Sequence, residues 1–322
     1  MTYRITLILI MNFTAVAAFA EMWAPLDVAH QMGMSKAAIE RVKKGEVVVE
    51  DLEASSDKDL SIAIIARVDA PLEEIYSVLE SGRLVELSTV TLSAGKIDTA
   101  TFSMDAMSLP DDVLQQLVDE PEDTFYMSSD ELALIKRAAV DGKARVLETY
   151  RGVLSARARA YWDEGVAGIA PYAGKDRSPR RDLDYANAAA KKLIQNVSVL
   201  AELDVVPAHS SSRARHRLTW AVQKGRDRAA PVLNHHILYA ENDGEVSIVR
   251  RFYSGYDYDA LQIVTGILPS TELACVVFYL NHTYTAQVAG FGGSAKRSIG
   301  RKLMQKELVA EMERTRTAIR DR

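Results

Sequence analysis

The sequence predicts an α+β protein in which a curved antiparallel sheet wraps around a long C-terminal helix. Two observations in the last third of the chain lead to this prediction. Segments rich in β-branched and aromatic residues follow one another between 232 and 285, with turn residues between them. Apolar residues then recur at helical spacing from 287 to 319. Because a sheet must bury one face against another element, we expect this helix to pack on it.

The four predicted strands are 232–240, 245–254, 260–268 and 272–285. The sequence Asn242-Asp243-Gly244 predicts a hairpin turn between the first two, since glycine adopts the positive φ that such turns need. The helix would turn one apolar stripe toward the sheet, formed by Val288, Phe291, Ala295, Ile299, Leu303, Met304, Leu308 and Met312. If that stripe is buried, Leu303→Asp should unfold the protein, because an unpaired buried charge is costly.

The first twenty residues have the pattern of a signal peptide. Arg4 precedes an apolar run at 5–19, which ends in the small-x-small sequence Ala18-Phe19-Ala20. The run is shorter than the roughly 20 apolar residues that span a bilayer. We therefore expect a signal peptide at 1–20, a mature chain from Glu21 and a periplasmic location. An uncleaved membrane anchor is the alternative.

Residues 21–322 are predicted to form a single domain. Ser35 is placed to cap a helix at 36–44. The β-branched runs at 46–50 and 61–68 then predict either two arms of a hairpin or one long bent strand. No long flexible linker separates a second domain.

The middle of the chain is predicted to be a helical insertion at 128–209, packed on the sheet or over its opening. Ser128 and Glu131 have the spacing of a capping box, which begins a helical segment at 130–164. Two glycines within that segment favour a break in it. A second helical segment is predicted at 181–203.

The order of these elements resembles that of a known superfamily. A strand ending in Arg67-Val68-Asp69-Ala70-Pro71-Leu72-Glu73 runs into a helix that reaches Gly82, and a later meander closes on a long helix. This layout is similar to the START and polyketide-cyclase (SRPBCC) superfamily, whose helix-grip fold wraps a curved sheet around a C-terminal helix. The resemblance covers 45–82 and 231–312 and concerns the fold more than the function. Tyr279-Leu280-Asn281 and the Gly293–Gly300 segment also resemble exported proteobacterial proteins of unassigned function.

Composition and motifs exclude several classes of function. The formal net charge of −5 over 322 residues argues against a nucleic acid partner, which would favour a strongly basic domain. The sequence contains no standard catalytic signature and predicts neither a cofactor nor a metal site. Cys275 is the only cysteine and lies within an apolar strand, so we expect a buried, unreactive thiol.

Strand alternation selects the candidate ligand-binding residues. Polar side chains at three positions share faces with apolar neighbours, so they could converge in a cavity. A mostly apolar pocket with a few polar groups is the usual form of a small-molecule site. The predicted ligand-binding residues are His235, Arg250, Phe252, Phe278 and His282. Alternatively, each polar residue is satisfied locally, or the assignment of the faces is inverted.

By resemblance, we expect an exported binding or carrier protein for a hydrophobic small molecule such as a lipid. One alternative is a cyclase- or hydrolase-like enzyme that uses His235, Arg250 or His282 for acid-base or oxyanion chemistry. Another is a structural or interaction module with a filled core. The C-terminal helix also carries Lys296, Arg297, Arg301, Lys302 and Lys306. This run predicts either a weak contact with a membrane surface or simply a solvated helix face.

Overall fold

A computed structural model describes most of the chain. The described residues are 35–80, 90–173, 178–193, 206–210, 214–225, 227–241, 244–290 and 292–320. Several predictions lie outside them: the signal peptide at 1–20, the helix end at 81–82, the segment 194–203, the turn residues Asn242 and Asp243, and Phe291.

Eight antiparallel strands form one sheet in the order β1-β2-β8-β7-β6-β5-β4-β3. The strands are β1 Val48–Asp51, β2 Asp59–Val68, β3 Thr91–Ile97, β4 Ala214–Lys224, β5 Ala229–Glu241, β6 Gly244–Ser254, β7 Ala260–Thr271 and β8 Ala274–Tyr284. The predicted α+β class and the meander from β5 to β8 are confirmed. Strands β1 and β2 pair with each other, so the hairpin alternative holds. Pairing of β2 with β8 joins the early and late parts of the chain.

The α-helices are α3 Lys36–Lys43, α4 Leu72–Glu80, α6 Asp111–Asp119, α7 Pro121–Thr124, α8 Ser129–Ala139, α9 Lys143–Glu164, α10 Pro179–Leu193 and α11 Gly293–Arg320. Short 3-10 turns are η2 Gly165–Gly168, η4 Pro207–His209 and η5 Ala286–Val288. Ser35 caps α3 as predicted, because its Oγ accepts a hydrogen bond from Ala38 N at 3.1 Å. The predicted segment 130–164 is two helices, α8 and α9, and the break is at Gly142, whose φ of 87° favours glycine.

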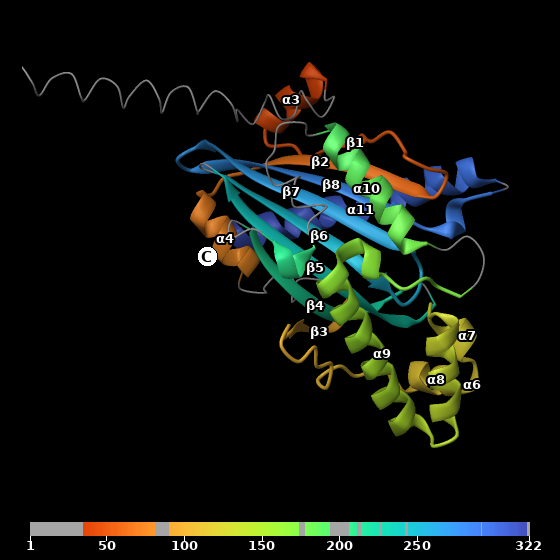
Figure 1. Ribbon diagram of the computed structural model, residues 1–322. Coiled ribbons are helices and arrows are strands. Elements are labelled where there is room, and N and C mark those ends of the chain that lie inside the picture. Colours follow the sequence, from red (N-terminus) through yellow and green to blue (C-terminus); the bar gives the residue numbers. More distant parts are fainter. Residues whose placement is uncertain are drawn as a thin grey trace, which may run out of the picture.

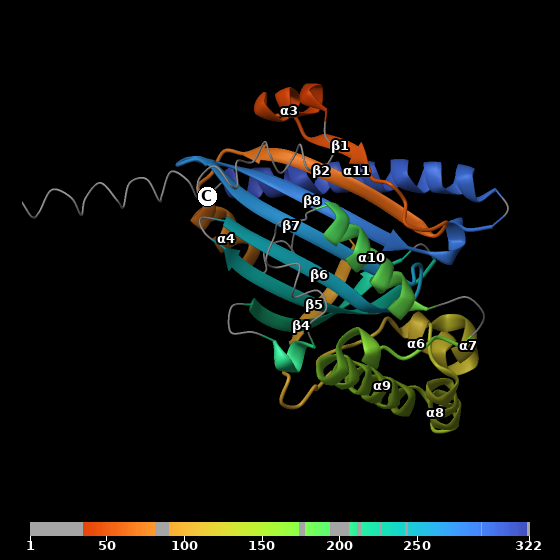
Figure 2. The same ribbon diagram turned by 45° about the horizontal axis from the view of Figure 1, so that its top comes forward.

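Helices cover both faces of the sheet (Figures 1 and 2). Helix α10 contacts β6, β7 and β8, and Tyr161 of α9 packs in the same core as Phe252. We call this the insertion-side face. Helix α11 contacts β2 and α4 on the opposite side, which we call the α11-side face. In Figure 1, the green α10 lies in front of the strands and the dark blue α11 lies behind them.

Four elements are absent from the sequence-based prediction: β3, α6, α7 and β4. The signal for β4 is the alternation of Leu218, Trp220 and Val222, all of which are buried. The helical middle segment therefore begins at Asp111, earlier than the predicted 128, and runs between β3 and β4.

The predicted apolar stripe of the C-terminal helix is wrong at Ala295, Ile299 and Leu303, which are exposed. Ile299 and Leu303 are 61% and 62% exposed. Farther along, Met312 and Ile319 pack in a core with Val277 of β8. Successive helical residues are about 100° apart, so Ile299 and Leu303 lie on the side of α11 opposite to Met312 and Ile319. Within the described residues, no helix has both the length and the apolar character to cross a bilayer.

Candidate functional site

One row of directly paired residues crosses six strands on the insertion-side face. The row consists of Leu218, His235, Arg250, Gln262, His282 and Ser61. Paired residues in an antiparallel sheet project to the same face, so His235, Arg250 and His282 do share one. Each of the six is at most 1% exposed.

Arg250 makes several hydrogen bonds to protein groups in this row and above it. Its guanidinium donates to Gln262 Oε1 at 3.2 Å, to Tyr161 OH of α9 at 3.1 Å and to Asn187 Oδ1 of α10 at 2.9 Å. The Tyr161 hydroxyl also lies 2.8 Å from His235 Nδ1. Burial, together with the Arg250 and His216 charges, lowers the pKa of His235, so this imidazole is neutral. Hydrogen bonds to Arg250 therefore connect both α9 and α10 to the sheet.

His282 belongs to a second buried cluster at the other end of the row. Its Nδ1 lies 2.7 Å from Ser61 Oγ, which in turn donates a short hydrogen bond to Asp59 Oδ1. Because the serine proton points to Asp59, Ser61 Oγ accepts a hydrogen bond from the N–H group at His282 Nδ1. Burial alone would raise the pKa of Asp59, but the hydrogen bond and charge of His282 and the Ser61 bond hold it below its usual value.

The two predicted aromatic site residues are packed against protein groups. The ring of Phe252 stacks on Tyr161, with centroids 4.0 Å apart and planes 2° from parallel. Phe278 lies so close to Gly266 of the neighbouring strand that a Cβ there would clash with its ring. None of the five predicted residues lines either of the two surface grooves described below. Their role in ligand binding stays a prediction.

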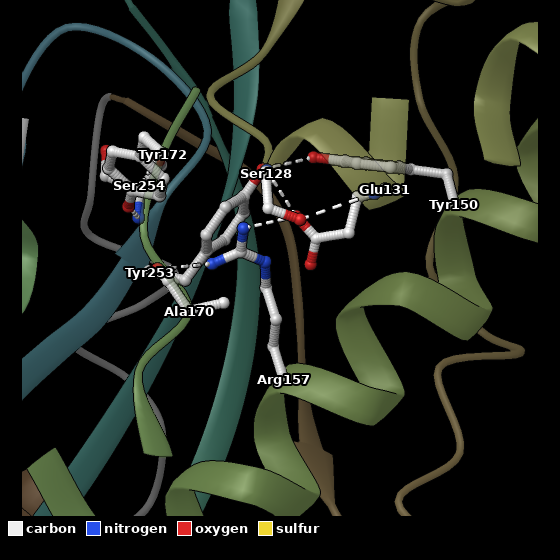
Figure 3. A network of polar contacts seen from close by, with 8 residues as sticks. All are labelled: Ser128, Glu131, Tyr150, Arg157, Ala170, Tyr172, Tyr253 and Ser254. Atoms are coloured by element: carbon white, nitrogen blue, oxygen red, sulfur yellow. Dashed lines mark hydrogen bonds and ion pairs between the residues drawn. The ribbon is translucent and has the colours of Figure 1, made fainter. Parts of the chain in front are cut away.

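A network around Arg157 of α9 fastens the insertion to β6 (Figure 3). Arg157 is 5% exposed and forms an ion pair with Glu131 of α8 at 2.5 Å. Its guanidinium carbon lies 4.8 Å from the ring centroid of Tyr253, whose hydroxyl is 2.8 Å from Tyr150 OH. Glu131 also accepts from Ser128 N at 2.6 Å, which confirms the predicted capping box. One carboxylate thus serves both the helix cap and the buried arginine.

The α11-side face is less completely buried than the insertion-side face. Two rows of paired residues cross it: Thr219, Asn234, Arg251, Leu261, Thr283 and Leu60, and next to them Arg217, His236, Val249, Ile263, Asn281 and Ile62. Ile62, on the strand that α11 contacts, is fully buried. Val249, Ile263 and Arg217, farther from α11, keep part of their surface accessible. We call the part formed by Arg217, Thr219, Asn234, His236, Val249, Arg251, Leu261, Ile263 and Tyr279 the Arg251 surface.

Arg251 is a buried cation with neutral partners. It is 9% exposed, and it donates to Asn234 Oδ1 at 2.8 Å and to Gln223 Oε1 at 3.0 Å. Its guanidinium carbon lies 5.2 Å from the centroid of the Tyr258 ring. Burial lowers the pKa of Arg251 to about 10. Among the described residues, no carboxylate pairs with it.

A neutral histidine lies between two arginines on this surface. His236 Nε2 is 2.9 Å from Thr219 Oγ1. Burial and the positive charges of Arg217 and Arg251 lower the pKa of His236 to about 4. Arg217 likewise has no acidic partner within the described part of the chain, and its Nε makes no hydrogen bond there. The local field therefore favours an anion.

Tyr279 and Glu311 connect the Arg251 surface electrostatically to α11. Burial raises the pKa of Tyr279, and the charge of Glu311 on α11 adds to this rise. Burial also raises the pKa of Glu311, although the residue is exposed by surface area. Val249, Ile263 and Leu261 supply the apolar part of the Arg251 surface.

Sequence reasoning chose Arg250 and missed its neighbour Arg251. Alternation assigned one face of each strand to the interior, and Arg250 does lie among apolar residues. Strand β8, however, is buried at ten of its eleven positions, so both of its faces are covered. The available signal was the continuous apolar run of β8, which is typical of a strand covered on both faces.

Two open grooves lie along α11. The larger, about 1260 Å³, lies between the first half of α11, the start of the insertion and the loops at one end of the sheet. Its lining includes Phe125, Tyr126, Tyr256, Ile299 and Leu303. The smaller, about 540 Å³, separates α11 from the residues that follow β1.

The chain matches no protein-family model, and it shows no significant similarity to a curated protein. Within the described ranges, no group of three or more His, Cys, Asp or Glu side chains is arranged to hold a metal ion. The candidate site combines two arginines, a neutral histidine and adjacent apolar side chains.

Proposed function

We propose that the protein binds or carries an amphiphile with an acidic head group, held on the Arg251 surface. The observation that supports this most is Arg251 itself, a buried guanidinium whose partners are two amides and an aromatic ring. Burying a charge without an opposite charge is costly, and an anionic ligand would compensate it. Arg217 adds a second positive charge on the same face.

The rest of the surface suits the other end of such a ligand. Leu261, Val249 and Ile263 lie side by side with the polar groups and keep accessible surface. An alkyl chain covering these residues would remove apolar area from water, at about 25 cal/mol per Å². The acidic group would then lie near Arg251, and the chain would extend across β6 and β7.

The architecture supports a relationship with the helix-grip superfamily as part of this proposal. The strand order places β2 beside β8, and the chain ends in a long helix on the sheet. Export through the signal peptide predicted at 1–20 is a further part of it. His235, Arg250 and His282, on which the enzymatic alternative relies, are buried, and each bonds to another protein group.

The proposal is tested by comparing two probes that differ in charge, decanoate and decanol, by isothermal titration calorimetry. We expect decanoate to bind the wild-type protein about tenfold more tightly or better, the scale of a hydrogen bond to a charged group. In Arg251→Gln this difference should disappear while decanol binding is retained. Equal affinities for the two probes in the wild-type protein would contradict the proposal.

A matched control uses a surface arginine. Arg145 lies on α9 and forms an exposed pair with Glu148. Arg145→Gln makes the same chemical change far from the Arg251 surface, so it should leave the preference for decanoate intact. If Arg145→Gln and Arg251→Gln have equal effects, decanoate is responding to the net charge of the protein and the proposal fails.

A further inference from the structure

Apolar and basic residues alternate on the outer side of the first half of α11. Ile299 and Leu303 are one turn apart and are 61% and 62% exposed. Lys296, Lys302 and Lys306 lie on the same side of the helix, at spacings of three or four residues from them, and all three are exposed. The adjacent side of the helix faces the sheet, where a Cβ on residue 300 would lie 3.3 Å from Leu60 Cδ1.

The charge of this segment is opposite to that of the whole chain. Residues 293–306 include five cations, the three lysines with Arg297 and Arg301, and no carboxylate. The complete chain has a formal net charge of −5. Glu307 ends the basic segment. Acidic residues also line the two grooves: Asp51 accepts from Gln305 and Glu122 pairs with Lys136, and the others are Asp123, Asp227 and Glu53.

We propose that this side of α11 docks on an anionic lipid bilayer. An interfacial helix inserts its apolar side chains shallowly while its basic residues reach the head groups. Ile299 and Leu303 would enter the bilayer, and Lys296, Lys302 and Lys306 would contact lipid phosphates around them. Each cation near an anionic surface contributes about 1 kcal/mol, which corresponds to a factor of about five in affinity.

This docking goes beyond the proposed function and does not rest on it. The Arg251 surface lies on the side of the sheet that α11 partly covers. Ile299 and Leu303 are exposed and line the larger groove, which contains no residue of the Arg251 surface. Loss of decanoate binding would therefore leave vesicle binding unchanged. The two proposals can fail separately.

The experiment places an environment-sensitive fluorophore on the full-length chain at Ile299→Cys. The natural Cys275 is fully buried, and burial raises its pKa to about 11, so the fluorophore will label the new thiol selectively. Leu273→Cys is the matched control, because Leu273 is 73% exposed and follows the acidic Glu272. Vesicles consist of phosphatidylcholine alone or of phosphatidylcholine with phosphatidylglycerol.

We expect the probe at 299 to report an apolar environment only with phosphatidylglycerol vesicles, and the probe at 273 to report none. The triple variant Lys296→Gln, Lys302→Gln and Lys306→Gln should reduce vesicle affinity about a hundredfold. The apolar run at 5–19 is present in all these chains, so it does not affect the comparison. Equal responses at 299 and 273, equal responses to the two vesicle types, or an unchanged affinity of the triple variant would overturn the docking proposal.

Discussion

Arg250 and Arg251 are consecutive residues of β6, and they meet opposite surroundings. Arg250 faces the insertion, where Tyr161 and Asn187 of α9 and α10 accept its hydrogen bonds. Arg251 faces the α11 side, where its partners are Asn234 of β5 and Gln223 of β4. The insertion brings polar groups to its face of the sheet, whereas α11 covers only part of the other face. The comparison teaches that burial alone does not identify a binding residue.

The partners of a buried charge indicate its role more directly. Residues whose polar atoms are satisfied by another helix hold the fold together, and their loss should reduce stability. Residues whose charge lacks an opposite charge from the protein are available to a ligand, and their loss should change binding. Three of the following predictions test the packing of the insertion-side face and one tests the α11 side.

The largest effect is expected for Arg250→Met. This change leaves the acceptors of Gln262, Tyr161 and Asn187 buried without their donor, at about 1–3 kcal/mol for each unsatisfied group. We expect a loss of about 3–5 kcal/mol in the free energy of unfolding, measured by urea denaturation. Arg251→Met should cost clearly less, because it leaves one buried acceptor, Asn234 Oδ1, without its donor and at the same time removes a buried charge that has no opposite charge beside it among the described residues. Similar losses for both variants would remove the contrast between the two faces.

Asp182 marks a place where the insertion-side packing is imperfect. This residue of α10 is 1% exposed, and its Oδ2 has no hydrogen-bond partner among the described residues. Burial raises the pKa of Asp182 from 3.8 to about 6. The negative charges of Asp259 and Asp59 add to this rise, and the positive charges of Lys58 and Arg181 reduce it. The folded state therefore holds this proton more tightly than the unfolded state does. Ionisation of Asp182 accordingly lowers the free energy of unfolding as the pH rises from about 4 to about 6.

Asp182→Asn should consequently stabilise the protein at neutral pH. The gain over wild type should be near zero at about pH 4 and grow to at most about 3 kcal/mol at about pH 7. Urea denaturation of both proteins across this range measures it, and contributions from other titrating groups cancel in the difference. A difference that is constant with pH would show that Asp182 does not titrate in this range.

Gly266→Ala tests how tightly the insertion-side face is packed. The new methyl group would meet the ring of Phe278 on the adjacent strand. Overpacking of this kind costs about 1–3 kcal/mol, which thermal denaturation would detect. Gly152→Ala is the matched control, since no atom lies within 4 Å of that Cβ position and α9 favours alanine over glycine. An equal response of the two variants would mean that Phe278 has room to move.

The smallest effect is expected for Leu303→Asp on the α11 side. Leu303 is 62% exposed, so the free energy of unfolding should change by less than about 0.5 kcal/mol. Ile319→Asp, on the same helix but 3% exposed, should cost several kcal/mol by comparison. Melting temperatures of the two variants test the position of α11 on the sheet. If Leu303→Asp unfolded the protein, Leu303 would be buried and this position of α11 would be contradicted.

The elements were predictable where local signals agree. Alternation and turn residues mark β5 to β8, and Ser35, Ser128 and Glu131 mark helix starts, because capping depends on residues a few positions apart. Strand β4 escaped prediction although Leu218, Trp220 and Val222 alternate. Its polar positions are occupied by several basic residues, which weakens the strand signal.

The site was harder to predict because its features depend on contacts between distant segments. Alternation places His235, Arg250 and His282 on one face, and the structure agrees. It does not tell which helix covers that face, and the Tyr161 and Asn187 contacts join residues more than 60 positions apart. The same limit explains Ile299 and Leu303, since an apolar stripe on a helix does not reveal how far the sheet extends beneath it.

The account is tested most directly by determining on which face of the sheet decanoate binds. Strands β6 and β7 offer adjacent methyl-bearing residues on opposite faces: Val249 and Ile263 on the α11 side, and Ile248 and Val264 on the insertion side. Nuclear Overhauser effects between protein methyl groups and bound decanoate would distinguish them. The account predicts contacts to Val249 and Ile263 and none to Ile248 and Val264. Contacts to Ile248 or Val264 would contradict it and place the ligand beneath the insertion.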